Sequence, residues 1–435
     1  MTSSVNLREL ALQIILAVIG QESYSHIILA EVLKKYQYLE KRERAFITKV
    51  SQGTIEHMIE LDYIIDRFSK TPISKMKPAI HGILCMAVYE LKYMDAIPAS
   101  ASCNEAVKLA KRKGFSNLSG FVNGVLRSIE RGLGQFKYPQ KNENETEYLS
   151  ITYSLPKWLV ALWQKTYSGE EIEEMGKAFL AKRFLTIRVN TAQTTVEQLK
   201  QTLSEKQIQV KEDETLPYAL HIAGIDHLEK LSEFLDGDFY VQDISSMLAM
   251  EEAGLQEGLT VLDVCGSPGG KGLYAAQEMH GTGMVYCRDV SAKKVQKIKD
   301  NISRCRVTNM KAQLRDATVS DAADREAADI VLADLPCSGL GVLGKKPDIK
   351  YRMNPDRIQS LIQVQRSILD VVCNYVRPGG ILLYSTCTID RMENEDNAAW
   401  FQEKHPEFEL EIQRQILPQE YGCDGFFYAK FRKTG

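Results

Sequence analysis

The stretch VLDVCGSPGGKG, residues 261–272, is an apolar run that ends in a glycine-rich turn and leads into a helical segment. Glycines in this turn allow the main chain to approach a ligand closely, and the amino end of the following helix favours polar or anionic groups. The chain continues with apolar runs such as GMVYCRDV (283–290) and ADIVLADLP (328–336), separated by helical segments. This alternation predicts a doubly wound, Rossmann-like α/β domain over residues 239–435.

Three nucleotide-type ligands compete for this turn. A phosphate-binding P-loop requires Gly, four residues, Gly-Lys and a hydroxyl residue, but Cys265 holds the place of the first glycine and Gly272 that of the hydroxyl. A dinucleotide site requires Gly-x-Gly-x-x-Gly, which is absent. S-adenosylmethionine remains, with Asp289 at the end of the second strand for its ribose hydroxyls and Asp316 at the end of the third near its adenine. The candidate cofactor-binding residues are Cys265, Gly266, Ser267, Pro268, Gly269, Gly270, Lys271, Asp289, Asp316 and Asp334.

Two further strands are predicted to end on a cysteine. Cys337 follows an Asp-Leu-Pro run, and Cys387 lies within YSTCTID, residues 384–390. Enzymes that methylate exocyclic amines place an aromatic residue after this proline, whereas a thiol suits attack on carbon. C5 of cytosine accepts a methyl group only after a thiolate adds to C6 and the charge at N3 is stabilised, and a base must then remove the C5 proton. The two thiols therefore favour methylation of cytosine C5, on a base that has left its stack.

Upstream of residue 239 the pattern changes twice. Residues 1–137 show apolar spacings of three and four, which predict an all-helical domain. Residues 138–150 are polar and turn-rich and are predicted to be a linker. Residues 151–238 interleave short strands such as FLTIRVNT (184–191) with helices, which predicts a small α+β, ferredoxin-like segment.

Composition restricts the possible functions. The 435 residues are 44% hydrophobic and 26% charged, as in ordinary globular proteins, and the net charge of −3 means that any nucleic-acid surface must be local. The nine cysteines form no C-x-x-C pair and the histidines no H-x-x-x-H pair, so a zinc site is disfavoured. An odd cysteine count favours a reduced, cytoplasmic protein, and no apolar run is long enough to predict a membrane span.

Four stretches together resemble the NOL1/NOP2/Sun family of RNA cytosine-5 methyltransferases. They are DLPCSGLGVLGKKPDIKYR (334–352), YSTCTIDRMENEDN (384–397), SPGGKG (267–272) and DGFFYAKFRK (424–433). In addition, NEAVKLAKRKGFSNLSGFVNGVLRSIER (104–131) is similar to the NusB family, an all-helical RNA-binding fold. This combination is typical of the bacterial branch, which implies S-adenosylmethionine as cofactor and 16S ribosomal RNA as partner, for a monomeric enzyme without a metal.

The resemblance also implies residue roles. Cys387 is expected to be the nucleophile that adds to C6, and Cys337 is expected to assist release of the covalent adduct. Asp334 would contact the cytosine near N3, and Lys271 would lie beside the cofactor and the reacting base.

The first motif departs from the family pattern. The family has Ala-Ala before Pro-Gly-Gly-Lys and Thr after it, whereas this chain has Gly266-Ser267 and Gly272. Loss of the hydroxyl at position 272 is expected to bear on the helix cap or on cofactor affinity.

Two basic clusters are candidates for contact with RNA phosphates. Lys111, Arg112 and Lys113, towards the end of the helical domain, fit a solvated helix end equally well. Lys345, Lys346, Lys350 and Arg352 follow the strand that ends at Cys337, and phosphate contacts there would make activity fall with salt. Two other functions stay open. One is the same chemistry on tRNA or another RNA, and the other is a non-catalytic rRNA-binding or assembly protein with a vestigial methyltransferase domain.

Overall fold

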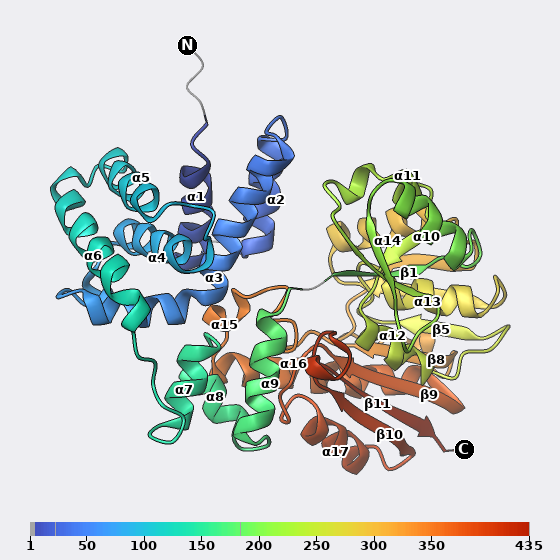
Figure 1. The fold of residues 1–435 in the computed structure, drawn as a ribbon. Coiled ribbons are helices and arrows are strands. Elements are labelled where there is room, and N and C mark those ends of the chain that lie inside the picture. Colours follow the sequence, from blue (N-terminus) through green and yellow to red (C-terminus); the bar gives the residue numbers. More distant parts are fainter. Residues whose placement is uncertain (1–4, 22, 183, 435) are drawn as a thin grey trace. The chain divides into compact units, whose positions relative to one another are not determined.

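The computed structural model describes residues 5–21, 23–182 and 184–434, which fold into two compact units (Figure 1). The first unit extends to Leu180 and also contains Leu343–Met353. The second comprises Ala181–Val342 and the chain from Asn354 onwards. The chain therefore leaves the second unit after Val342, contributes eleven residues to the first, and returns.

The first unit is built from helices, as predicted for residues 1–137. Local sequence signals start them: the Asn6 side chain accepts a hydrogen bond from the Glu9 amide at the start of α1, and Pro78 is the first residue of α4. Buried Leu, Ile, Val and Ala side chains between Leu10 and Ile129 form one continuous core. The helices are α1 (Leu7–Ile19), α2 (Ser25–Lys35), α3 (Lys41–Phe68), α4 (Pro78–Tyr93), α5 (Ala99–Arg112), α6 (Ser119–Gly132), α7 (Glu145–Thr152), α8 (Lys157–Trp163), α9 (Gly169–Leu180) and α15 (Ile349–Arg352).

The structure divides the chain differently from the predicted boundaries. α7 begins inside the stretch 138–150 that was predicted as a linker, because Asn144 caps it by accepting from the Glu147 amide at 3.0 Å. α8 and α9 lie within 151–238, the predicted α+β segment, yet they belong to the helical unit. The boundary at Leu180 depends on which helices pack against one another. The periodicity of a local stretch of sequence carries no information about such packing.

The second unit contains a four-stranded antiparallel sheet in the order β2-β3-β1-β4. Alternate residues of β1, including Ile187 and Val189, are fully buried against α10 residues such as Leu199 and Leu203. This is the predicted ferredoxin-like α+β part. Its elements are β1 (Leu185–Val189), α10 (Val196–Glu205), β2 (Gln209–Glu212), β3 (Ala219–Ala223), α11 (Ser232–Leu235) and β4 (Phe239–Val241).

The rest of the second unit is a seven-stranded sheet in the order β10-β11-β9-β8-β5-β6-β7. The five strands from β9 to β7 are parallel, which confirms the Rossmann-like prediction, and β11 and β10 add an antiparallel edge. The strands are β5 (Thr260–Asp263), β6 (Met284–Asp289), β7 (Met310–Leu314), β8 (Ala328–Asp334), β9 (Val376–Thr386), β10 (Phe408–Ile416) and β11 (Phe426–Lys433). The helices are α12 (Ile244–Glu251), α13 (Gly270–Glu278), α14 (Ala292–Arg304), α16 (Pro355–Val372), α17 (Glu395–Lys404) and α18 (Pro418–Tyr421).

Strand order places the ligand site. β5 pairs with β6 on one side and with β8 on the other, so the order reverses at β5, and crevices at such points bind ligands beyond the carboxyl ends of the strands. Asp263, Asp289 and Asp334 are the last residues of β5, β6 and β8, and Cys387 follows β9 directly. Among the described residues no helix has the length and apolarity needed to cross a membrane.

The segment Leu343–Met353 is fastened into the helical unit by hydrogen bonds. The fully buried Asp348 carboxylate accepts from the Ser25 amide at 3.0 Å and from the Ser25 hydroxyl at 2.6 Å. The Tyr351 hydroxyl donates to the Ile55 carbonyl at 2.7 Å, and its ring packs against the helical core. A buried carboxylate with two donors holds a segment more firmly than surface contacts do.

Two of the predicted RNA contacts lie in this segment. Lys350 is only 4% exposed, and its Nζ donates to the Glu56 carbonyl at 2.6 Å. Arg352 donates to the main-chain carbonyls of Ser23 and Gln21. These internal bonds correct the prediction for Lys350 and Arg352, because Lys350 donates to a carbonyl in the middle of α3 and Arg352 to carbonyls between α1 and α2, rather than to solvent. Lys345 and Lys346 are exposed.

Buried Lys350 gives the helical unit a pH-dependent stability. Burial lowers the pKa of Lys350 to about 7, so between pH 7 and its unfolded value near 10.5 the unfolded chain binds more protons than the folded one. We expect the free energy of unfolding to rise from pH 7 to pH 9 and this rise to be smaller in Lys350→Met. Calorimetric melting at both pH values measures it, and an equal rise in both proteins would contradict the assignment.

Candidate active site

The glycine-rich turn between β5 and α13 is shaped by contacts that exclude larger side chains. A Cβ at Gly266 would lie 2.4 Å from both Asp263 Oδ2 and Cys287 Sγ. Gly269 precedes α13 with φ of +108°, a conformation that favours glycine. The turn can therefore bring its main chain close to a ligand at the sheet edge.

Gly272, the departure from the family pattern, has a structural counterpart. A Cβ at this position would lie 2.6 Å from the terminal methyl carbon of Met310, the first residue of β7. The Met310 side chain thus fills the space that a threonine side chain would need. The Met310 side chain is flexible enough to fill this space, so the residues beneath the turn stay packed although position 272 has no side chain.

A cavity of about 160 Å³ lies between this turn and the end of β8. It is lined by residues of the turn, by Lys271 and by the stretch VQDISS, residues 241–246, which begins at the last residue of β4 and was not predicted from the sequence. The signal available for it was the polar pair Gln242 and Asp243 directly after a strand. The lining residues are Val241, Gln242, Asp243, Ser246, Asp263, Gly266, Ser267, Pro268, Gly270, Lys271 and Asp334.

Lys271 and Asp334, predicted from separate stretches, meet in this cavity. Lys271 Nζ lies 2.7 Å from Asp334 Oδ2, and the Ser385 hydroxyl donates to Asp334 Oδ1 at 2.9 Å. Lys271 also lies 4.9 Å from the centre of the Phe426 ring. Both carboxylate oxygens of Asp334 are thereby fixed, and an ammonium lies beside them.

The two predicted catalytic thiols are in contact. Cys337 Sγ and Cys387 Sγ are 3.4 Å apart, and both residues are partly buried. The hydrogen bond with Cys387 and burial raise the pKa of Cys337 well above its ordinary value, and the charge of Glu393 acts in the same direction. Cys337 is therefore protonated at neutral pH.

A buried glutamate that the sequence argument missed holds the two cysteine-bearing turns together. Glu393 is fully buried and accepts from the Ser338 amide at 2.9 Å, from the Ser338 hydroxyl, and from Gln365 at 2.9 Å. Ser338 also hydrogen-bonds Thr388 at 2.7 Å between their hydroxyls. Ser338 and Thr388 directly follow Cys337 and Cys387, so this network fixes the spacing of the thiols.

Asp263 and Gln242 present unused polar atoms to the cavity. Asp263 Oδ1 and Gln242 Oε1 are buried and have no hydrogen-bond partner within the described protein. Burial raises the pKa of Asp263 to about 7, although Lys271 opposes the shift. Unpaired buried acceptors are costly, and two of them in one cavity fit a ligand that donates hydrogen bonds, such as an ammonium group.

Asp263 should make the ligand-free protein less stable as the pH rises. Its folded pKa of about 7 exceeds the usual 3.8, so the folded chain binds more protons between these values, and the stabilising contribution is lost as pH rises towards 7. We expect Asp263→Asn to lose less stability than wild type between pH 5 and pH 7.5. Chemical unfolding at both pH values measures this, and identical losses would contradict it.

The predicted cofactor residues Asp289, Asp316 and Cys265 do not line this cavity. Asp289 is buried at the end of β6 and receives hydrogen bonds from the Ser291 amide and Lys294. Asp316 is exposed beyond the end of β7 and is bonded to the amide and hydroxyl of Thr318. Neither of these carboxylates lines the cavity. Cys265 is partly buried, and burial raises the pKa of its thiol to about 12.

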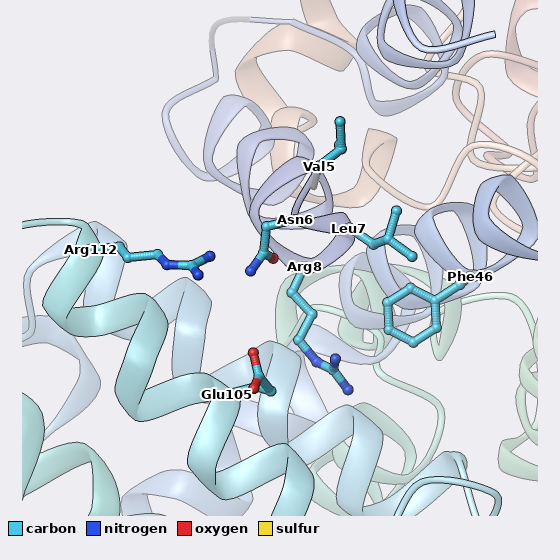
Figure 2. Close-up of a pocket in the computed structure, with 7 residues that line it drawn as sticks. All are labelled: Val5, Asn6, Leu7, Arg8, Phe46, Glu105 and Arg112. Atoms are coloured by element: carbon cyan, nitrogen blue, oxygen red, sulfur yellow. The ribbon is translucent and has the colours of Figure 1, made fainter. Parts of the chain in front are cut away.

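The other predicted RNA-contacting cluster lies at the end of α5. Lys111, Arg112 and Lys113 are exposed, and Lys113 pairs with Glu9 at 2.7 Å. Figure 2 shows Arg112 projecting toward Asn6 across a hollow of about 270 Å³. This hollow lies within the helical unit and is separate from the thiols.

Comparison with known proteins gives three matches to family models along the chain. NusB family matches residues 5–131, the ferredoxin-like domain of RsmF/B-like methyltransferases matches 155–226, and 16S rRNA methyltransferase RsmB/F matches 251–432. The probable ribosomal RNA small subunit methyltransferase B of Bacillus subtilis is 34% identical over 99% of this chain and 99% of its own length. The corresponding Synechocystis protein is 32% identical over 99% of this chain and all of its own.

The chain belongs to the RsmB/Sun family of methyltransferases. The family and the NusB-like front domain predicted from the sequence are thereby confirmed. Among solved structures, the crystal structure of PH0851 superimposes with a TM-score of 0.82 at 27% identity and covers 99% of both chains. The methyltransferase family model covers the seven-stranded sheet, from the end of α12 to β11, and with it the cavity's glycine turn and both thiols.

Proposed function

We propose that this RsmB/Sun family member methylates C5 of a cytosine in 16S ribosomal RNA, with S-adenosylmethionine as methyl donor and a covalent Cys387–C6 adduct. The observation that carries the proposal is the contact of Cys337 and Cys387 at 3.4 Å, beside the Lys271–Asp334 pair. A methyltransferase acting on nitrogen or oxygen needs no thiol, whereas attack on C5 needs one thiol to make a bond and gains from a second group when it breaks.

The cavity fits the cofactor. S-adenosylmethionine, when bound, supplies an electrophilic methyl group. The glycine turn would face it with main-chain groups, and Asp263 and Gln242 offer their unpartnered oxygens to its ammonium group. We assign the ribose hydroxyls to Asp289 at the end of β6, which would accept from them in exchange for its present partner Lys294. Exposed Asp316 remains the candidate near the adenine.

Side chains of the protein itself bind the reacting base, activate it and assist its release. The Cys387 thiolate adds to C6, which makes C5 nucleophilic enough to accept a methyl group. Thiolate addition makes N3 basic, and once N3 takes a proton from solvent, Asp334, held by Lys271 and Ser385, accepts a hydrogen bond from it and so stabilises the adduct. Removal of the C5 proton then allows the C6–sulfur bond to break. A thiol with a raised pKa stays protonated, so Cys337, with its Sγ 3.4 Å from Cys387 Sγ, suits donation of its proton to the departing Cys387 thiolate, while solvent water takes the C5 proton.

The substrate assignment rests on relatives and on charge. Both of the similar curated proteins are named as methyltransferases of small-subunit ribosomal RNA. The exposed Lys345 and Lys346, and the basic end of α5 at Lys111–Lys113, supply local positive charge on a chain of net charge −3. Methylation of tRNA or another RNA is the alternative substrate. The non-catalytic alternative is disfavoured because the thiols, Lys271 and Asp334 are all in place.

The test is transfer of labelled methyl groups to purified RNA, followed by digestion to nucleosides. Transcripts of 16S ribosomal RNA, 23S ribosomal RNA and tRNA would be compared, together with small-subunit particles. We expect label in 5-methylcytidine from 16S RNA or the particle. Label in another nucleoside would overturn the chemistry, label in another RNA would overturn the substrate, and no transfer at all would favour the binding protein.

A further inference from the structure

Three potential metal ligands come together in the helical unit, apart from any group used in the proposed reaction. Asp62 lies on α3, and His81 and Cys85 lie on the neighbouring α4. His81 Nε2 is 2.7 Å from Asp62 Oδ1, and the Cys85 thiol donates to the same oxygen at 3.2 Å. All three ligand atoms lie within 4.8 Å of one another. Within the described residues this is the one such group of three.

This cluster lacks the spacings from which a zinc site is usually predicted. Helix α4 supplies His-x-x-x-Cys, rather than Cys-x-x-Cys or His-x-x-x-His, and the third ligand comes from another helix. Residues four apart on a helix lie on the same face, one turn above the other. The packing of α3 against α4 then brings Asp62, nineteen positions before His81, to that face.

The spacing suits a tetrahedral metal ion. Ligand atoms about 2.0–2.3 Å from a tetrahedral zinc lie roughly 3.3–3.8 Å from one another. The observed contacts of 2.7 and 3.2 Å are somewhat shorter and require the side chains to open by less than about 1 Å around an ion. Imidazole, thiolate and carboxylate are the donors that zinc accepts, and hard ions such as magnesium do not take the thiol.

The surroundings favour a cation as well. Cys85 is fully buried, while His81 and Asp62 are partly open, so an ion has access from the carboxylate side. The carboxylates of Asp62 and Asp66 put negative charge near the Cys85 thiol. A bound divalent ion takes this thiol as thiolate, and the proton leaves to solvent.

We propose that Asp62, His81 and Cys85 bind one zinc ion, with water as fourth ligand, and that this ion fastens α3 to α4. The site is structural and lies in the unit that does not hold the thiol pair. It is therefore independent of the proposed methyl transfer.

The experiment measures metal content of the full-length protein without a polyhistidine tag. Protein would be loaded with zinc, passed through metal-free buffer and analysed by elemental mass spectrometry. Wild type is compared with Cys85→Ser and His81→Asn, and Cys103→Ser is the control because Cys103 is an equally buried thiol of the same unit. We expect about one zinc per chain in wild type and control, and less than about a tenth in the two site variants.

A second measurement decides the matter if the site variants fail to fold. Titration of wild type and Cys103→Ser with cobalt(II) should give a thiolate-to-cobalt charge-transfer band that saturates at one equivalent. Zinc retained by both site variants, or wild type that holds almost no zinc and gives no such band, overturns the proposal. Loss of zinc should also lower the melting temperature of wild type and leave that of Cys85→Ser unchanged.

Discussion

Replacing Cys387 with alanine is expected to lower the rate of methyl transfer by about 10³-fold or more, to the limit of detection. Without the thiolate, no bond forms at C6 and C5 stays too weak a nucleophile to accept the methyl group. The same substitution should remove every trace of covalent protein–RNA complex. Both readouts come from one reaction: incorporated label, and a denaturing gel of the same mixture.

Two matched variants serve as controls for this result. Cys387→Ser keeps the size and the hydrogen bond toward Cys337 but not the nucleophile, so it should be as inactive as alanine. Cys373→Ala removes a buried thiol at the opposite, amino-terminal end of β9 and should keep most of the activity. An active Cys387→Ser or Cys387→Ala would exclude the covalent mechanism, while binding of S-adenosylmethionine measured by calorimetry would show whether the cavity is intact.

Replacing Cys337 with alanine should have an equally large effect on turnover but the opposite effect on the adduct. Attack by Cys387 does not need Cys337, so the protein should still become linked to RNA. Release needs the second group, so the linked species should accumulate to nearly one per active chain while multiple turnover falls by about 10²-fold or more. The denaturing gel, run over a time course, separates the two steps.

The double variant Cys337→Ala/Cys387→Ala identifies which thiol forms the bond. It should give no adduct, and adduct from Cys387→Ala alone would reverse the two assignments. Normal turnover by Cys337→Ala would mean that the 3.4 Å contact has no role in release. In that case the raised pKa of Cys337 would be a result of its burial alone.

The catalytic half of the fold was predictable because its signals are local and repeated. Four of the five parallel strands contain an apolar run with a polar residue at its end, and the rule that ligands bind beyond those ends brings Lys271, Asp334 and the two cysteines to one edge. Glu393 could not be found this way. It is one of several acidic residues in MENED, and only the folded chain shows that it is the one pointing back to Ser338.

For Lys350 and Arg352 the local sequence pattern gave a wrong prediction. A basic run after a catalytic strand resembles a phosphate-binding loop, and nothing in its composition reveals that it belongs to another packing unit. Burial of a lysine requires a specific carbonyl partner, here that of Glu56, and such a partner nearly 300 positions away leaves no local trace in the sequence. The Asp62–His81–Cys85 cluster was not predicted from the sequence for the same reason, because its ligands come from two different helices.

The placement of Leu343–Met353 has a consequence for the order of events on the ribosome. The helices up to Leu180 are synthesised first, but the residues that occupy their remaining contacts, such as Tyr351 and Asp348, emerge about 170 residues later. At elongation rates of roughly 5–20 residues per second that interval is roughly 10–35 seconds. During it Ser25 and the Ile55 carbonyl lack their partners, so the amino-terminal part remains incomplete. Its maturation is thereby timed by the arrival of the segment that follows Cys337 in the chain.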